Sequence, residues 1–341
     1  MKAVLTKTRA PCYYASMGGN GGTIVVVGGA NIDIQGRPKA AFLAGDSNPG
    51  LISRSFGGVG HNIAENLALL EMNVELVTVV GRDPEGEAML EDCRAKGVGI
   101  SHCLRSKVPS PSYLCIVDES GGLVGAVADM SAMEELVPAR FEALRSLFAE
   151  ADYIVADANV PEDSLRWIAG TFGRQARSGV GPRLYLDPVS RAKAGKILGI
   201  TASFDCVKPN RREALLLAGV EEGDPAALSR AMSERGRLPG ELFISLGAEG
   251  MFYRTTDSLG IVALPGLAGG YPVVNRSGAG DAACAALLWG EAQGFDAESR
   301  AEFALVAAML TASCPEPVHQ SMGDEELRLV RHELFHKETD Q

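Results

Sequence analysis

Short apolar segments rich in β-branched residues alternate with longer stretches rich in Ala, Leu and Glu along most of this chain. This alternation constrains the fold strongly, because strands separated by helices pair in parallel and bury both faces of their sheet. Six segments are predicted to be core strands: 24–27, 74–80, 153–156, 184–186, 205–207 and 242–245. Eight segments are predicted to be helices: 62–70, 85–96, 140–149, 163–172, 211–217, 225–234, 282–292 and 297–313.

Two stretches, 34–56 and 112–128, interrupt this alternation. They contain strand-like runs, and residues 119–122 (Glu-Ser-Gly-Gly) carry a hairpin signal. The predicted fold class is therefore α/β, a Rossmann-type three-layer sandwich with a central, mostly parallel sheet and a small β-lid. We expect a flexible extension over 1–22, one domain over 23–330 that includes the lid, and a C-terminal tail over 331–341.

The composition excludes several classes of protein. A net charge of −11 argues against a nucleic-acid partner, since phosphate backbones are bound by clustered Lys and Arg. Seven cysteines form no CxxC pair and are odd in number, which favours a reduced, cytoplasmic setting over a disulfide framework. No apolar run reaches the roughly 18 residues that a membrane span needs, so no membrane partner is expected.

The segment Ser277-Gly-Ala-Gly-Asp281 directly precedes a strongly helical run. Glycines at a helix N-terminus let unpaired backbone N–H groups approach an anion, and the helix dipole favours negative charge there. A phosphate site is therefore predicted. Asp281 itself could cap the helix, or it could accept a proton from a hydroxyl that attacks beside the anion.

Three other motif patterns bear on the function. The glycines also fit the dinucleotide fingerprint G-x-G-x-x-A, but they lie late in the chain and Glu291 follows about ten positions on, not the roughly 20 that a dehydrogenase needs. The sequence has no G-x-x-x-x-G-K-[ST] phosphate loop. His332-Glu-Leu-Phe-His336 matches the zinc-protease pattern H-E-x-x-H, but only five residues follow and the segment is an amphipathic, charged tail, which argues against a metalloprotease.

Four landmarks occur in order: residues 24–33 (IVVVGGANID), 56–64 (FGGVGHNIA) closed by Gly81, 208–213 (KPNRRE), and 245–250 (SLGAEG) leading to 278–281 (GAGD). In these the chain resembles the pfkB, or ribokinase-like, family of carbohydrate and nucleoside kinases over about residues 23–325. The resemblance implies an ATP-dependent kinase with a ribokinase-like fold.

The resemblance also implies roles at the nucleotide side. Asp281 would take the proton of the attacking hydroxyl, and the backbone N–H groups of Gly278, Ala279 and Gly280 would stabilise charge on the transferred phosphoryl. Further contacts to ATP would come from Lys208, Asn210, Ser245 and Gly247, with Gly278 and Gly280. Mg²⁺ would be held near Asn210 and Glu213 through water molecules, because Mg²⁺ keeps much of its hydration shell. The same pair could instead form a helix capping box.

On the acceptor side, Asn31, Asp33, Gly57, Gly58 and Asn62 are implied to bind a sugar, whose hydroxyls both donate and accept. Asn31 and Asp33 could also form a turn, and Asn62 a cap. Contacts to a base or to the lid are predicted for Asn48, Ser112, Asp129 and Asn159.

A narrower resemblance, to the pseudouridine kinases of this family, rests on seven tracts: 29–33, 46–50, 57–60 with 62–70, 112–114, 129–130, 155–157 with 159, and 187–190 with 193. It implies phosphorylation of the ribose 5′-hydroxyl of pseudouridine. Two alternatives stay open: a ribokinase or inosine-type kinase, and a non-catalytic nucleoside-binding sensor. The family's Asp-Thr before Gly-Ala-Gly-Asp is replaced by Asn275-Arg276-Ser277, so a requirement for K⁺ stays open. A homodimer in which lids pack together is expected.

Overall fold

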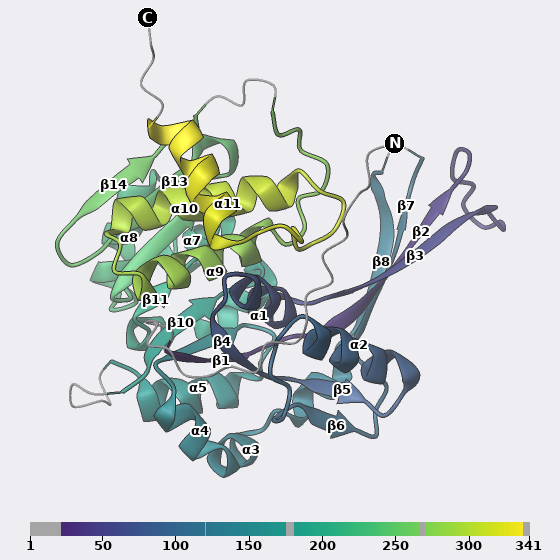
Figure 1. Ribbon diagram of the computed structural model, residues 1–341, viewed down its shortest axis with the longest axis horizontal. Coiled ribbons are helices and arrows are strands. Elements are labelled where there is room, and N and C mark those ends of the chain that lie inside the picture. Colours follow the sequence, from purple (N-terminus) through teal and green to yellow (C-terminus); the bar gives the residue numbers. More distant parts are fainter. Residues whose placement is uncertain (1–21, 120, 175–180, 266–269, 337–341) are drawn as a thin grey trace, which may run out of the picture.

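The computed structural model describes residues 22–119, 121–174, 181–265 and 270–336 (Figure 1). The predicted extension over 1–22, apart from Gly22, and the last five residues of the predicted tail lie outside the described residues. Among the described residues, no helix is long and apolar enough to cross a membrane.

The central sheet has eight strands in the order β14-β13-β12-β11-β10-β9-β1-β4. The six strands from β12 to β4 are parallel, and β13 and β14 are antiparallel at one edge. Their bounds are β1 Thr23–Val27, β4 Asn73–Val77, β9 Tyr153–Asp157, β10 Arg183–Asp187, β11 Cys206–Val207, β12 Glu241–Ser245, β13 Met251–Arg254 and β14 Leu259–Val262. The predicted mostly parallel sheet is confirmed.

Both faces of this sheet are buried, which is why its strands are apolar at successive positions. In β1, Ile24 and Val26 belong to one core cluster, and Val25 and Val27 belong to the other. The first cluster is covered by α1 Val59–Leu69, α2 Pro84–Ala95, α9 Ala279–Ala292, α10 Ala297–Ala312 and α11 Asp324–Arg331. The second is covered by α3 Pro138–Ala143, α4 Arg145–Glu150, α5 Glu162–Phe172, α6 Arg191–Ala194, α7 Arg211–Ala218 and α8 Pro225–Glu234.

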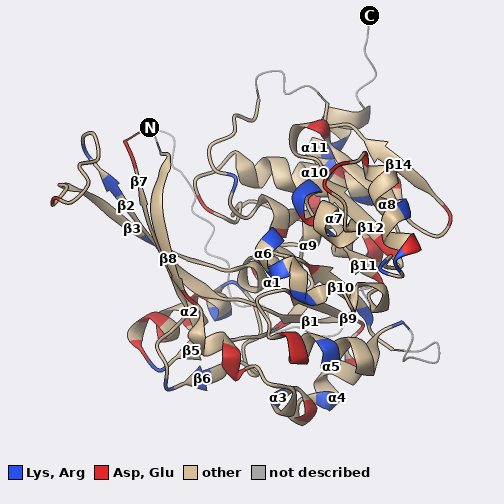
Figure 2. Ribbon diagram, turned by 180° about the vertical axis from the view of Figure 1, so that it is seen from behind, with Lys and Arg blue, Asp and Glu red and all other residues tan. Residues whose placement is uncertain are grey.

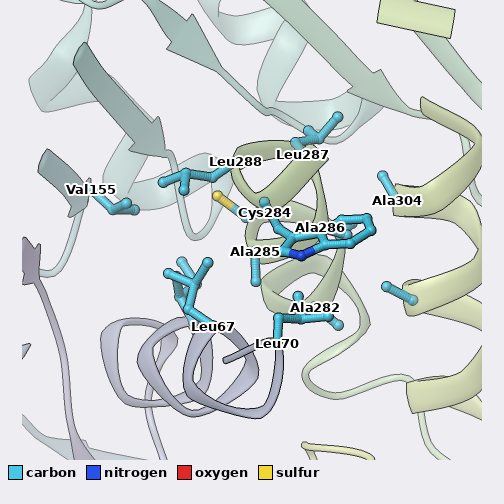
Figure 3. Packing of buried hydrophobic residues seen from close by; sticks show 14 of the residues in the cluster. Leu67, Leu70, Val155, Ala282, Cys284, Ala285, Ala286, Leu287, Leu288 and Ala304 are labelled. Carbon is cyan, nitrogen blue, oxygen red and sulfur yellow. The ribbon is translucent and has the colours of Figure 1, made fainter. Parts of the chain in front are cut away.

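The first cluster brings α1 and α9 together although they lie far apart in the sequence. Figure 3 shows Leu67 of α1, and Leu70 directly after this helix, beside Ala282 and Ala285 of α9. The small alanine side chains let the two helices approach closely. This packing holds the start of α9 against α1.

Two predicted elements were wrong in detail. The predicted strand 74–80 is interrupted at Thr78, after which β5 Val79–Gly81 pairs with β6 Leu104–Ser106 in a separate two-stranded sheet. The predicted helix 140–149 is divided at Leu144 into α3 and α4. Short 3₁₀ turns at Ser131–Glu135, Gly195–Ile197, Thr201–Ser203 and Gly247–Glu249, and a final π turn at His332–His336, complete the described elements.

A second sheet projects from this body beside α1 (Figure 1). It is formed by β3 Gly50–Gly57, β2 Asn31–Pro38, β7 Ser112–Val117 and β8 Leu123–Asp129, in that order across the sheet. These strands come from the two stretches for which a lid is predicted, with β2 beginning three residues earlier. Figure 2 shows charged residues of both signs distributed over the helices, whereas β7 carries none and β8 only Asp129.

Candidate active site

Ionisable side chains lie at the carboxyl ends of the central strands. Asp157 ends β9 and Asp187 ends β10, and the two residues are register partners. Lys208 directly follows β11, and its Nζ lies 3.1 Å from Asp187 Oδ2. All three side chains are buried. Since ligands of parallel α/β folds bind outside the carboxyl ends of the strands, this edge is the candidate site.

The turn after β10 is strained. Asp187 Oδ1 accepts a hydrogen bond from the backbone N–H of Val189, which has a φ of 65°. A β-branched residue adopts this left-handed conformation at a cost, and such strain is common at functional sites. The ion pair with Lys208 and this turn together fix the Asp187 carboxylate.

Helix α9 begins at the same edge. Its N-cap is Gly278, with a φ of 78°, and a Cβ there would lie 1.7 Å from the carbonyl oxygen of Pro317, so only glycine fits. The first-turn N–H groups of a helix have no intrahelical partner, and here they belong to Ala279, Gly280 and Asp281. A Cβ on Gly280 would lie 3.5 Å from Lys208 Nζ. The helix start and the lysine therefore present positive charge to one region.

Asp281 lies in the first turn of α9, and it does not cap the helix. Its Oδ2 accepts a hydrogen bond of 2.8 Å from Asn62 Nδ2 on α1. Burial raises the pKa of Asp281 to about 8; Asp187 adds to this increase, while the hydrogen bond from Asn62 and the charge of Lys208 oppose it. The group is thus a carboxyl that gains and loses its proton near neutral pH.

Asn31, Asp33, Gly57 and Gly58 lie together where β2 and β3 leave the body. Asn31 Nδ2 donates to Asp33 Oδ1 over 2.7 Å, and burial raises the pKa of Asp33. A Cβ on Gly57 would lie 2.3 Å from Asp33 Oδ2. Gly58, with a φ of 100°, is the N-cap of α1 and lies against the backbone of Gly29. Residues 57–62 connect this group to Asn62 and so to Asp281.

Asn159 lies beside the same backbone turn. A Cβ on Gly29 would lie 2.7 Å from Asn159 Nδ2, and Lys193 Nζ donates to Asn159 Oδ1. Asp157 accepts hydrogen bonds from the backbone N–H groups of Gly29 and Asn159. Burial raises the pKa of Asp157. These contacts hold the turn between β1 and β2 in place.

Asn210 and Glu213 form a capping box at the start of α7. Glu213 Oε2 accepts from the backbone N–H of Asn210 over 2.8 Å, and its Oε1 accepts from Asn210 Nδ2 over 2.6 Å. Glu213 is buried, and burial raises its pKa; Asp187 acts in the same direction. Asn210 forms a parallel β-bridge with Ser245, the last residue of β12. Gly247 follows two residues later, and a Cβ on Gly247 would meet no atom within 4 Å. These residues therefore line the same edge of the sheet.

Three predicted acceptor-side residues are not brought to this group. Asn48 lies in the loop between β2 and β3, where its side chain bonds to the backbone of Leu43 and Asp46. Ser112 pairs with Ile32 on one side and with Asp129 on the other. The side chains of Ser112 and Asp129 therefore lie on the face of the second sheet opposite to Asp33. Asp129 is exposed and caps the turn that follows by accepting from Ser131.

Asp157 and Asp187 are missing from the predicted site residues. The signal was available, because each is the polar residue that ends an apolar strand, and strand ends share one edge of a parallel sheet. The burial of Lys208 beside Asp187 could not be inferred from spacing.

Comparison with known proteins is consistent with this geometry. The chain is 32% identical over 298 residues to the pseudouridine kinase of Escherichia coli, covering 85% of this chain and 90% of that one. It is also 32% identical over 291 residues to an uncharacterized sugar kinase of the same organism, YeiI, covering 84% and 77%.

Solved structures share the fold. A carbohydrate kinase from Agrobacterium tumefaciens superposes with a TM-score of 0.79 at 27% identity, covering 92% of this chain and 98% of that one. The ribokinase of Arabidopsis thaliana, solved with ribose and ATP, gives a TM-score of 0.74 at 21% identity, covering 91% and 98%, and shows the ribokinase-like fold. The profile of the pfkB family carbohydrate kinases matches residues 22–322. The chain belongs to the pfkB family and is a sugar or nucleoside kinase.

Proposed function

We propose that this protein transfers the γ-phosphoryl group of ATP to the ribose 5′-hydroxyl of pseudouridine, giving pseudouridine 5′-phosphate and ADP. The observation that carries the proposal is the buried Asp281 carboxyl in the first turn of α9, joined by Asn62 to the helix that follows Gly57 and Gly58. The choice of nucleoside is supported by the identity to the Escherichia coli pseudouridine kinase. We place the reaction in the cytoplasm, in line with the six described cysteines, which are all free.

Asp281 would act as the general base. A base works best when its pKa lies near the working pH, and burial raises the pKa of Asp281 to about 8. The proton would pass from the attacking hydroxyl to the Asp281 carboxylate as that oxygen bonds to the γ-phosphorus, while the bond from this phosphorus to the bridging oxygen breaks and ADP leaves. Asn62 would hold the carboxylate in place through its Nδ2.

The start of α9 would stabilise the transferred phosphoryl group. The N–H groups of Ala279, Gly280 and Asp281 are the unpaired donors of the helix, and Gly278 lets the chain turn so that they face one region. Lys208, buried beneath Gly280 and paired with Asp187, adds a fixed positive charge. Ser245 and Gly247 would contact the nucleotide from the neighbouring strand end.

Mg²⁺ would be held by water molecules that donate to Glu213 and Asn210. Both carboxylate oxygens of Glu213 already accept hydrogen bonds from Asn210, so each has only one lone pair left for a metal-bound water. This fits Mg²⁺, which keeps several waters and neutralises charge on the phosphates.

The acceptor would lie between Asp281 and the second sheet. Asn31 and Asp33 of β2 lie on the same face of the second sheet as Tyr113 of β7, and this face is the more polar of the two. Asn159, held by Lys193, would contact the base. Asn48, Ser112 and Asp129 are not needed in this arrangement.

The opposite face of the second sheet would form a homodimer. Ile52, Leu114, Ile116 and Val127 lie on it in register and are 76%, 46%, 36% and 70% exposed. Ile52, Leu114 and Ile116, together with Ile34, line an open groove of about 410 Å³. A second copy of the same sheet is the occupant that matches an apolar, self-complementary surface.

A substrate panel tests the proposal. Release of ADP is measured with pseudouridine, uridine, ribose, adenosine and fructose in parallel, each with ATP and Mg²⁺. We expect the highest kcat/KM with pseudouridine. A higher value with ribose or a purine nucleoside would assign the protein to a ribokinase or inosine-type activity, and nucleoside binding without ADP release would identify a sensor.

A further inference from the structure

A buried histidine stands next to Asn62. His61 is 2% exposed, and its Nδ1 lies 3.2 Å from Asn62 Oδ1. The other polar atom of that amide, Nδ2, donates to Asp281. The amide of Asn62 is therefore held at both ends. An asparagine amide can rotate by half a turn, and only one orientation gives a donor to the carboxylate.

We propose that His61 is a positioning residue for the base: by donating from Nδ1 to Asn62 Oδ1, it holds the Asn62 amide in the orientation that hydrogen bonds to Asp281. The rotated amide would place Oδ1 against the carboxylate of Asp281, where two acceptors repel each other. It would also place Nδ2 against the Nδ1 proton of His61. The pair therefore favours one orientation on both sides.

The surroundings of His61 fix its position. Its Nε2 faces Glu65 Oε2 at 3.9 Å and has no hydrogen-bond partner in the part of the chain that the structure describes. Glu65 is in turn held by Lys96 at 2.8 Å and by Gln320 at 2.8 Å, and Lys96 also binds Asp92. A chain of polar contacts thus runs from α2 and the segment after α10, through α1, to Asp281.

A metal ion is a weaker explanation of this cluster. His61, Glu65 and Asp92 offer ligand atoms within 4.8 Å of one another. However, Lys96 Nζ already lies 2.8 Å from both carboxylates, where a cation would lie. A metal would have to displace the ammonium group, whereas the contact of His61 with Asn62 requires no rearrangement.

Charged groups surround both His61 and Asp281. His61 faces Glu65 on its own helix, Asp92 of α2 and Lys96 directly after α2, and burial lowers the pKa of His61. Asp281 faces Asp187, Lys208 and Asp157 at the strand ends. Since none of these groups is changed by a substitution at His61, a shift in the pKa of Asp281 reports on the Asn62 amide.

Two substitutions of His61 distinguish the role of its Nδ1 donor from that of the volume of its imidazole ring. An Asn side chain places its amide nitrogen near the position of Nδ1, and a Gln side chain places it near Nε2. His61→Asn should therefore keep the donor to Asn62. His61→Gln should lose that donor while it fills the space and keeps a donor toward Glu65.

The experiment is an NMR titration of Asp side chains labelled with ¹³C at the carboxyl carbon, with Asp281 assigned by its loss in Asp281→Asn. We expect the pKa of Asp281 to rise by roughly one unit in His61→Gln, since a hydrogen bond to a charged group is lost, and to stay near the wild-type value in His61→Asn. The acid limb of kcat/KM should shift by the same amount. Equal shifts in both variants, or none in either, would overturn the proposal.

Two further measurements complete the test. In an Asn62→Ala background, His61→Gln should give no additional shift, and an additional shift of the same size would contradict the proposal. Should His61→Gln fail to fold, the ¹⁵N shifts of His61 in the wild-type protein decide the question: a protonated Nδ1 supports it, and a bare Nδ1 overturns it. The inference rests on the proposed role of Asp281, but the titrations need no turnover, so a failed substrate panel and a failed His61 test are distinguishable.

Discussion

Asn62 Nδ2 donates a hydrogen bond to Asp281 Oδ2 over 2.8 Å, although 219 positions separate the two residues in the chain. One belongs to the helix that follows the N-terminal glycine tract, and the other to the helix that follows the C-terminal one. The packing of α1 on α9 keeps this bond in place (Figure 3). The two ends of the fold are thus joined at one carboxyl group.

Replacing Asp281 by Asn should remove most turnover and leave the fold and the binding of ATP largely intact. Asn is isosteric and can still accept from Asn62, but it cannot take a proton. We expect kcat to fall by about 10²–10⁴-fold, the usual contribution of a general base. Asp296→Asn, which changes the acid that caps α10, is the matched control and should retain activity. Near-normal turnover of Asp281→Asn would refute the assignment of the base.

The pH dependence of kcat/KM should report the same group. Because burial raises the pKa of Asp281 to about 8, the active carboxylate forms only as the pH rises toward that value. We expect kcat/KM to increase between about pH 6 and 9 and to level off above that range, since kcat/KM reports groups of the free enzyme. Asn62→Ala should shift this limb to higher pH. An acid limb near pH 4 that stays at the same pH in Asn62→Ala would be inconsistent with this prediction.

Stability should also depend on Asp281. Its folded pKa of about 8 exceeds the ordinary value of 3.8, so the folded state holds this proton more tightly than the unfolded state. The stabilisation is complete below about pH 3.8, declines as the pH rises, and is lost once the pH passes the folded pKa. In urea unfolding, the free energy of unfolding of Asp281→Asn should increase relative to that of the wild type as the pH rises from 4 to 8, by a few kcal/mol at most. Above pH 8 the difference should stay constant. A constant difference from pH 4 to 8 would contradict the raised pKa.

The parallel core of the fold is readable from the sequence because it is buried on both faces. Ile24 to Val27 form a continuous apolar run, which only a doubly covered strand tolerates. The edge strand β14 lacks this signal, because Leu259 and Ile261 are exposed and a run of four residues fits many structures. The break at Thr78 depends on a bond from the N–H of Leu104 to its carbonyl, which no local pattern encodes.

The site was predictable where residue types and strand ends coincide. Asp281, Asn62, Asn31 and Asp33 lie where the motifs imply. The positions of Ser112 and Asp129 depend on pairing register, because Ser112 is opposite Ile32 and therefore on the other face from Asp33. Their contacts with the base or the lid stay predictions. A change of one residue in the pairing register would place Ser112 on the same face as Asp33, and the register is set by contacts between distant segments. The contact of His61 with Asn62 depends likewise on burial that the sequence does not reveal.

Glu213→Gln separates the two roles of Glu213. Gln also completes a capping box, so the helix should keep most of its stability, but the negative charge facing metal-bound water is lost. We expect the concentration of Mg²⁺ for half-maximal activity to rise by about tenfold or more, in proportion to a lost charge-assisted hydrogen bond. Asp224→Asn, at the N-cap of α8, is the control for a cap without a metal role. Equal Mg²⁺ dependence in both variants would leave Glu213 as a cap alone.

Ile52→Lys and Val127→Lys test the proposed dimer. Both residues lie on the apolar face of the second sheet and are 76% and 70% exposed, so the charge is tolerated in a monomer but is buried without a partner in a dimer. We expect sedimentation to show the wild type as a dimer and either variant as a monomer at the same concentration. Leu259→Lys, on the edge strand β14 and 64% exposed, is the control and should stay dimeric. A wild type that sediments as a monomer, or variants that stay dimeric, would exclude this face as the interface.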